Sequence, residues 1–138
     1  MAEMNTLIEI VARLRGEGGC PWDRAQTPRS MRPYLLEEVY EVLEALDNED
    51  PALLKKELGD LLFQIIFLAQ IATEAGQFTF GDVVEGISTK MIHRHPHVFE
   101  ANYSGSGDEG EIEAWEARKA NERKDTGSAL DGVPQQLP

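Results

Sequence analysis

The chain carries two pairs of carboxylates at helical spacing. Glu38 and Glu41 lie three residues apart, and so do Glu57 and Asp60, which stand in a run of leucines and phenylalanines. If the two pairs lie on antiparallel neighbouring helices, their side chains can converge. Four carboxylates make a ligand set suited to Mg²⁺ or Mn²⁺, and a set without His or Cys is less suited to zinc. The spacing therefore predicts a metal site held by these four residues.

The surroundings of the second pair sharpen this interpretation. At 100° per residue, Glu57, Asp60 and Gln64 form one narrow stripe on a helix that is apolar in almost every other direction. A lone buried carboxylate must become protonated or find a partner. A buried ion pair with Lys or Arg is the alternative to a metal ion. The presence of two acidic pairs, one on each of two successive helices, favours the metal site.

Basic and aromatic residues also recur at helical spacing. Lys90 and Arg94 are four residues apart and could clamp phosphate oxygens, although solvated surface cations would show the same spacing. Trp115 and Lys119 repeat this spacing, which suits a nucleobase or a ribose phosphate. The alternative for Trp115 is packing of its helix onto the core. Trp22 allows the same two interpretations.

Helices must position these residues, because no segment shows convincing strand alternation. We expect an all-α helical bundle of about five helices in one domain over 1–124, followed by a polar tail over 125–138 that is poorly ordered. We expect the first helix to begin after a cap at Asn5 or Thr6, and the second to begin at a Ser30 cap with Pro33 in its first turn. The third should run from Pro51 to about Ala75. The fourth should span Phe80 to Arg94, and the fifth Ile112 to Lys124. We expect "CPWDRAQT" to be a turn-rich loop.

The composition limits the possible partners. The chain has 138 residues and a net charge of -12, so neither nucleic acid nor an anionic membrane is an expected partner. The apolar stretch "LLFQIIFLAQIA" is shorter than the roughly 20 residues of a membrane span. Cys20, the single cysteine, and an N-terminus unlike a signal peptide fit a cytoplasmic protein. The apolar helix around Glu57 is hard to cover with five helices, so we expect a homodimer or a dimer of dimers.

The ordered set of these motifs resembles the MazG family of all-α nucleoside triphosphate pyrophosphohydrolases. The matching stretches are "GCPWDRAQT", "YLLEEVYEVLEALDNED", "ELGDLLFQIIFLAQ", "KMIHRHPHVF", "WEARKANER" and "ALDGVPQQLP". More narrowly, the chain looks like the first domain of two-domain bacterial members, which continue where this sequence stops at Pro138.

The resemblance implies a reaction and assigns roles to residues. It implies Mg²⁺-dependent hydrolysis of NTPs or dNTPs between the α and β phosphates, for cleansing of the nucleotide pool. The implied Mg²⁺ ligands are Glu38, Glu41, Glu57 and Asp60, and Mn²⁺ is a possible substitute. Lys90 and Arg94 are implied to contact phosphates, and Trp115 and Lys119 to contact the nucleotide. Glu37 matches the first glutamate of the EExxE motif and is a candidate for orienting the water.

Two other functions stay open at this point. One is a narrow-specificity enzyme of the same superfamily, acting on dUTP, dCTP or phosphoribosyl-ATP. The other is a catalytically weak helical dimer that binds a nucleotide for regulation. The complete set of acidic and basic motif residues favours an active enzyme.

Overall fold

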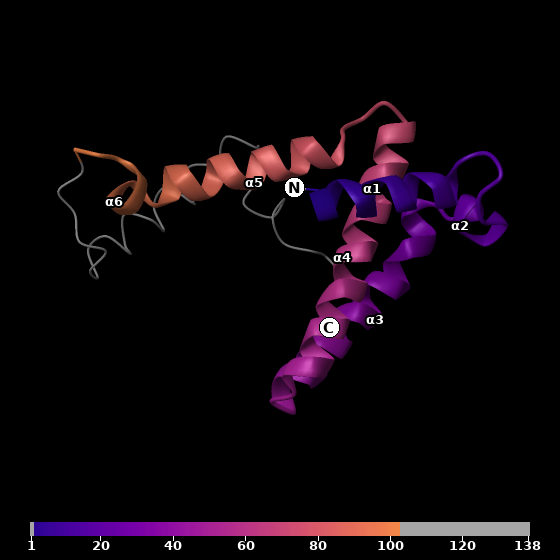
Figure 1. Ribbon diagram of the computed structural model, residues 1–138, viewed down its shortest axis with the longest axis horizontal. Helices are drawn as coiled ribbons and strands as arrows, with labels where there is room; N and C mark the ends of the chain where they lie inside the picture. Colours follow the sequence, from indigo (N-terminus) through magenta and orange to yellow (C-terminus); the bar gives the residue numbers. More distant parts are fainter. Residues whose placement is uncertain (1, 103–138) are drawn as a thin grey trace. The chain divides into compact units, whose positions relative to one another are not determined.

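The computed structural model describes residues 2–102, which fold into helices without a strand among them. This confirms the all-α class. The helices are α1 (Ala2–Arg15), α2 (Pro21–Ala25), α3 (Pro28–Asp47), α4 (Pro51–Glu74), α5 (Phe80–Arg94) and α6 (Pro96–Phe99) (Figure 1). The helix predicted over 112–124 lies outside the described residues, and so do Trp115, Lys119 and the predicted tail. The chain divides into two compact units, Met1–Val83 and Val84–Pro138.

A helical hairpin of α3 and α4 dominates the first unit. Only residues 48–50 join the two helices, which run antiparallel and pack along each other (Figure 1). The carboxylate of Asp50 accepts a hydrogen bond from the Leu53 N–H at 3.2 Å, and Pro51 is the first residue of α4. Gly76, with a φ of +70°, follows the end of α4. The predicted start and end of this helix are confirmed.

The predicted N-cap residue of α3 is wrong. Thr27, not Ser30, is the N-cap, and the two side chains form a reciprocal capping box through Oγ1 of Thr27 and Oγ of Ser30. The helix starts at Pro28, so Pro33 lies inside it rather than in its first turn. The prediction failed because Thr27 and Ser30 can both cap, and the outer residue prevails when its partner closes the box.

The first helix also starts earlier than predicted. α1 begins at Ala2, and Thr6 lies inside it with its hydroxyl donating to the Ala2 carbonyl at 2.9 Å. One face of α1 packs on α4 and completes a small core. The fully buried members of this core are Val11 of α1, Met31 of α3, and Ile66 and Phe67 of α4.

A tight turn after α1 places α2 where a loop was predicted. The Cys20 N–H donates to the Leu14 carbonyl at 2.9 Å. A Cβ on Gly19 would lie 2.3 Å from the same carbonyl oxygen, so this close approach requires glycine. Pro21, with its fixed φ, then opens the single turn of α2.

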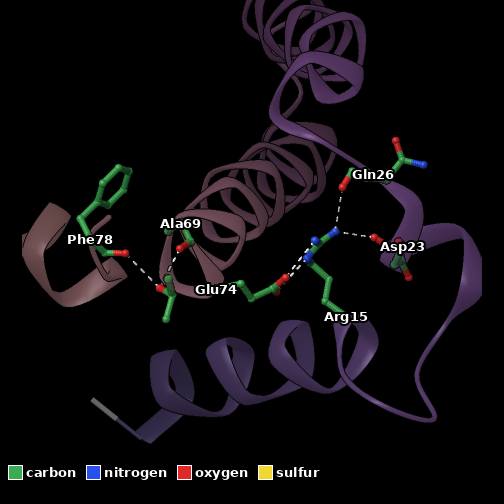
Figure 2. A network of polar contacts seen from close by, with 7 residues as sticks. Arg15, Asp23, Gln26, Ala69, Glu74 and Phe78 are labelled. Atoms are coloured by element: carbon green, nitrogen blue, oxygen red, sulfur yellow. Dashed lines mark hydrogen bonds and ion pairs between the residues drawn. The ribbon is translucent and has the colours of Figure 1, made fainter. Parts of the chain in front are cut away.

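Arg15 ties three elements of this unit together. Figure 2 shows its guanidinium between α4 and the segment that carries α2. It donates to both carboxylate oxygens of Glu74, at 2.9 and 3.0 Å, and to the carbonyls of Asp23 and Gln26, at 2.6 and 3.1 Å. The same guanidinium lies 5.2 Å from the ring centroid of Phe67. α1, α2 and α4 are therefore joined at one buried side chain.

The apolar face of α3 is not covered within the first unit. Leu36, Val39, Leu43 and Leu46 are each exposed by between 38% and 52%. Leu58 and Ile65 of α4 are also substantially exposed. No helix in the described part of the chain is long and apolar enough to cross a membrane.

In the chain segment that follows, α5 has its predicted bounds. Its start is fixed by a reciprocal pair in which the Thr79 N–H donates to Asp82 Oδ2 at 2.9 Å and the Asp82 N–H donates to Thr79 Oγ1 at 3.1 Å. The helix ends at Arg94, two residues before Pro96, as predicted. The short helix α6 was not predicted.

Candidate metal centre

The hairpin brings three of the predicted ligands together. Glu38 comes from α3, and Glu57 and Asp60 come from α4. One carboxylate oxygen from each of the three residues lies within 4.8 Å of the others. The convergence follows from the antiparallel pairing, because residues at equal distances from a short turn meet across it. Three carboxylates at this separation can share one divalent cation.

This cluster combines burial with unbalanced negative charge. The Glu57 side chain is only 6% exposed, whereas Asp60 is partly open to solvent. Oε2 of Glu38 is buried and has no hydrogen-bond partner among the described residues. Burial raises the pKa of Glu38, and the charges of Asp60 and Glu57 raise it further. A cation placed among these oxygens would reverse that penalty.

Lys56 lies at the edge of the cluster. Its ammonium nitrogen is 3.2 Å from Glu57 Oε1 and 3.4 Å from Asp60 Oδ2. These contacts raise the pKa of Lys56, chiefly through the hydrogen bond to Glu57 and then through the one to Asp60. Lys56 was not predicted from the sequence, although its spacing of four from Asp60 is a visible signal. The alternative of an ion pair is thus realised in part, by a lysine that is itself largely exposed.

Glu41 and Glu37 stand outside the group of three. Glu41 is half-buried one turn beyond Glu38 on α3, and its carboxylate is not among the oxygens within 4.8 Å. Glu37 is exposed. Both still act on the cluster at a distance, because their negative charges raise the pKa of Glu38.

Gln64 continues the acidic stripe on α4 by one turn beyond Asp60. The residue is buried, and its Oε1 has no hydrogen-bond partner in the described part of the chain. Oε2 of Glu38 and Oε1 of Gln64 are thus two buried acceptors without a hydrogen-bond partner among the described residues. The candidate metal-ligand atoms are therefore oxygens with negative or partial negative charge, which fit Mg²⁺ or Mn²⁺.

The other predicted site residues that the structure describes belong to α2 and α5. Lys90 is exposed and Arg94 is buried, both on α5 in the second unit. Trp22, on α2, is exposed, and its ring lies edge to face with that of Tyr34 of α3, with the two centroids 5.7 Å apart. Trp115 and Lys119 are outside the described residues. The first unit therefore contains the carboxylate cluster and Trp22.

Comparison with known proteins connects this geometry to a family. The profile of the MazG nucleotide pyrophosphohydrolase domain matches residues 26–99. A nucleoside triphosphate pyrophosphohydrolase of Escherichia coli (strain K12) is 48% identical over 141 residues, in a match that covers 100% of this chain and 53% of that protein. An uncharacterized protein of Bacillus subtilis (strain 168) is 46% identical over 99% of this chain and 28% of its own length. The chain thus spans about half, or less, of the length of these relatives.

A solved structure shares the fold. The crystal structure of a mazG-related protein from Thermotoga maritima superposes with a TM-score of 0.68 and 27% sequence identity. The match covers 84% of this chain and 98% of the other. A TM-score of 0.68 over this coverage means that the two proteins share the all-α architecture.

Proposed function

Because the chain belongs to the MazG nucleotide pyrophosphohydrolase family, we propose that it hydrolyses nucleoside triphosphates to nucleoside monophosphates and pyrophosphate. The supporting observation is the cluster of Glu38, Glu57 and Asp60, in which the buried Oε2 of Glu38 has no hydrogen-bond partner among the described residues. The names of the curated relatives point the same way. The bond cleaved is the one that bridges the α and β phosphates, and water supplies the hydroxyl of the monophosphate.

The proposal includes a divalent cation, Mg²⁺ in the first place, with Mn²⁺ as a substitute. When bound, it supplies positive charge to the triphosphate and lowers the pKa of water. Glu38, Glu57 and Asp60 would hold it, and Glu41 would be the fourth ligand that the EExxE motif offers. Such a cation also explains how a chain of net charge -12 can accept a polyanion.

Other residues would bind and orient the substrate. Glu37 orients the attacking water from the exposed side of α3. Lys90 and Arg94 donate to phosphate oxygens, and Trp115 and Lys119 contact the nucleotide. In this proposal the enzyme works in the cytoplasm as a homodimer or a dimer of dimers and cleanses the nucleotide pool.

A product analysis tests the reaction. The purified chain is incubated with each common NTP and dNTP, in Mg²⁺ and in EDTA, and the products are separated by chromatography. The proposal expects monophosphate and pyrophosphate in Mg²⁺ and no product in EDTA. Diphosphate with phosphate would show that a different bond is cleaved. A chain that binds nucleotides without turnover would instead be the regulatory module.

A substitution tests whether the cluster carries the reaction. Glu38→Gln removes one negative ligand while it keeps the side-chain volume. Turnover should fall by more than about 100-fold, since changes in groups that only support a metal ligand already cost 10–100-fold. Without metal, the variant should melt at or above the wild-type temperature, because like-charge repulsion is relieved.

Glu44→Gln is the matched control for this variant. Glu44 lies on the same helix, is exposed and is not in the cluster. Its substitution should leave turnover within about twofold, since surface changes away from a site have small effects. Near-wild-type turnover in Glu38→Gln would remove Glu38 from the proposed site.

A further inference from the structure

A buried amide adjoins the carboxylate cluster. Gln64 of α4 is 9% exposed, and its Oε1 has no hydrogen-bond partner among the described residues. A buried acceptor without a donor is unfavourable, and such groups in folded proteins commonly have a functional reason. The amide of Gln64 is therefore a group to which a ligand can supply the missing donor.

The side chain of Gln64 leaves α4 in the same direction as the carboxylates of the cluster. At 100° per residue, it lies about 20° around the helix from Glu57 and about 40° from Asp60. It stands about 6 Å beyond Asp60 along the helix axis, on the side away from the turn between α3 and α4. The amide is thus one helical turn from the place where the proposed cation binds.

Charge is distributed unequally along this stripe of α4. Toward the α3–α4 turn, the Lys56 ammonium lies 3.2 Å from Glu57 Oε1 and 3.4 Å from Asp60 Oδ2. Lys55 is exposed beside it. In the opposite direction the stripe continues with the neutral Gln64. A polyphosphate carries acceptors and negative charge, so it is attracted to the lysine end and gains nothing from the oxygen of Gln64.

Two exposed arginines at the start of α3 do not reverse this polarity. Arg29 and Arg32 lie about 180° and 120° around α3 from Glu38, so they face away from the cluster. The part of the stripe around Gln64 is therefore left to an uncharged part of the substrate that can donate a hydrogen bond.

We propose that Oε1 of Gln64 accepts a hydrogen bond from the 3′-hydroxyl of the substrate's sugar. This inference rests on the proposed function and specifies the sugar end of the same site. The sugar follows directly after the α-phosphate, so an acceptor one turn from the cation is within its reach. The 3′-hydroxyl is the donor that ribose and deoxyribose share. Gln64 therefore selects nucleotides with a free 3′-hydroxyl and does not separate NTPs from dNTPs.

The test removes one hydroxyl at a time from the ligand. Calorimetry in Mg²⁺ gives the Kd of the α,β-methylene triphosphates of adenosine, 2′-deoxyadenosine and 3′-deoxyadenosine, and the Kd of inorganic tripolyphosphate. With the wild type, loss of the 3′-hydroxyl should raise the Kd by roughly 3- to 12-fold, as for one neutral hydrogen bond, and loss of the 2′-hydroxyl by less than about twofold.

Gln64→Met keeps the length of the side chain and removes the acceptor. In this variant the adenosine and 3′-deoxyadenosine analogues should bind within about twofold of each other, because the cycle of two changes isolates their coupling. Tripolyphosphate should bind as it does to the wild type. Gln70→Met is the matched control, since Gln70 is a glutamine of the same helix about 120° around from Gln64. It should keep the wild-type ratio of the two Kd values.

Thermal melts without ligand separate a binding role of Gln64 from a structural one. Because methionine removes a buried acceptor that has no donor, Gln64→Met should melt at or above the wild-type temperature. A variant that melts several degrees lower, or does not fold, would show that the amide serves the core and would overturn the proposal.

The binding data can also contradict the proposal directly. Equal Kd values for the adenosine and 3′-deoxyadenosine analogues in the wild type would overturn it, and so would a penalty confined to the 2′-deoxy analogue. A 3′-hydroxyl effect that persists in Gln64→Met would assign that hydroxyl to another residue. Since the readout is binding, a wild-type chain without turnover would contradict the proposed reaction and leave this comparison decisive.

Discussion

The carboxylate of Glu57 lies in an apolar helix with two other carboxylates and one lysine as its neighbours. The acidic stripe could be recognised from the sequence, because Glu57, Asp60 and Gln64 interrupt an apolar run at helical spacing. The sequence could not show that Glu38 enters the cluster while Glu41 stays outside it. Their spacing says that they share a flank of α3, but the register and tilt of α3 against α4 decide which of them enters the cluster. That choice depends on tertiary packing, which a helical wheel does not contain.

Lys56 offers the sharpest prediction at the scale of a residue. Its ammonium lies where it compensates Glu57 and Asp60 without a metal ion, so it should compete with a bound cation. Lys56→Met should tighten Mn²⁺ binding by about two- to fivefold, the range expected when an exposed ion pair is removed. Paramagnetic resonance of Mn²⁺ measures the free ion and gives the affinity.

The neighbouring lysine provides the control for this prediction. Lys55 is exposed and makes no ion pair among the described residues, so Lys55→Met removes the same charge without the contact. Its effect on Mn²⁺ affinity should be smaller than that of Lys56→Met. Equal effects would reduce the role of Lys56 to its net charge, and weaker binding in Lys56→Met would mean that the lysine supports the site.

At the scale of elements, helix ends with a single strong signal could be predicted. Asp50 with Pro51 fixed the start of α4, and Gly76 fixed its end. Where two cap residues compete, as at Thr27 and Ser30, the local sequence does not decide between them. The single turn of α2 was missed because so short a helix lacks the apolar periodicity that indicates longer ones. It persists through tertiary contacts, above all those of Arg15.

The ion pair that joins α1 to α4 makes stability depend on pH. The hydrogen bonds from Arg15 lower the pKa of Glu74 below the ordinary glutamate value of about 4.3. The stabilisation is therefore present above that ordinary value and is lost as the pH falls through the lowered pKa. Glu74→Gln should melt about 2–8 °C below the wild type at pH 7. The difference should shrink toward zero in strongly acidic buffer.

Thermal melts of both proteins across the pH range check this sign. The comparison of two chains cancels the titration of all other carboxylates, provided that these titrate alike in both. A gap that stays constant down to low pH would show that the charge of Glu74 does not stabilise the fold. In that case the hydrogen bonds from Arg15 to the carbonyls of α2 would carry the connection alone.

At the scale of the whole molecule, α3 leaves its apolar face uncovered. The sequence indicates which residues form this face, but not what covers it. Leu36, Val39, Leu43 and Leu46 remain exposed in the first unit, and burying them against a second copy is the simplest way to remove them from water. This surface is the structural basis for proposing a homodimer.

A single charge on this face tests the proposed assembly. Leu43→Glu places a carboxylate in the middle of the apolar face, where burial against a like surface would be costly. Light scattering at micromolar concentration should give the mass of a dimer or a multiple of it for the wild type and a lower mass for the variant. Glu44→Gln, on the exposed flank, should keep the wild-type mass. A monomeric wild type would contradict the proposal.

The three-residue turn between α3 and α4 has a consequence for the order of folding. Because Glu38, Glu57 and Asp60 all belong to one helical hairpin, closing the loop between them costs little chain entropy. Contacts that are so local form early in folding, before more distant elements such as α1 must dock. A cation present during refolding would then bind the nascent hairpin and accelerate folding. A ligand that recognises only the finished protein would instead slow its unfolding.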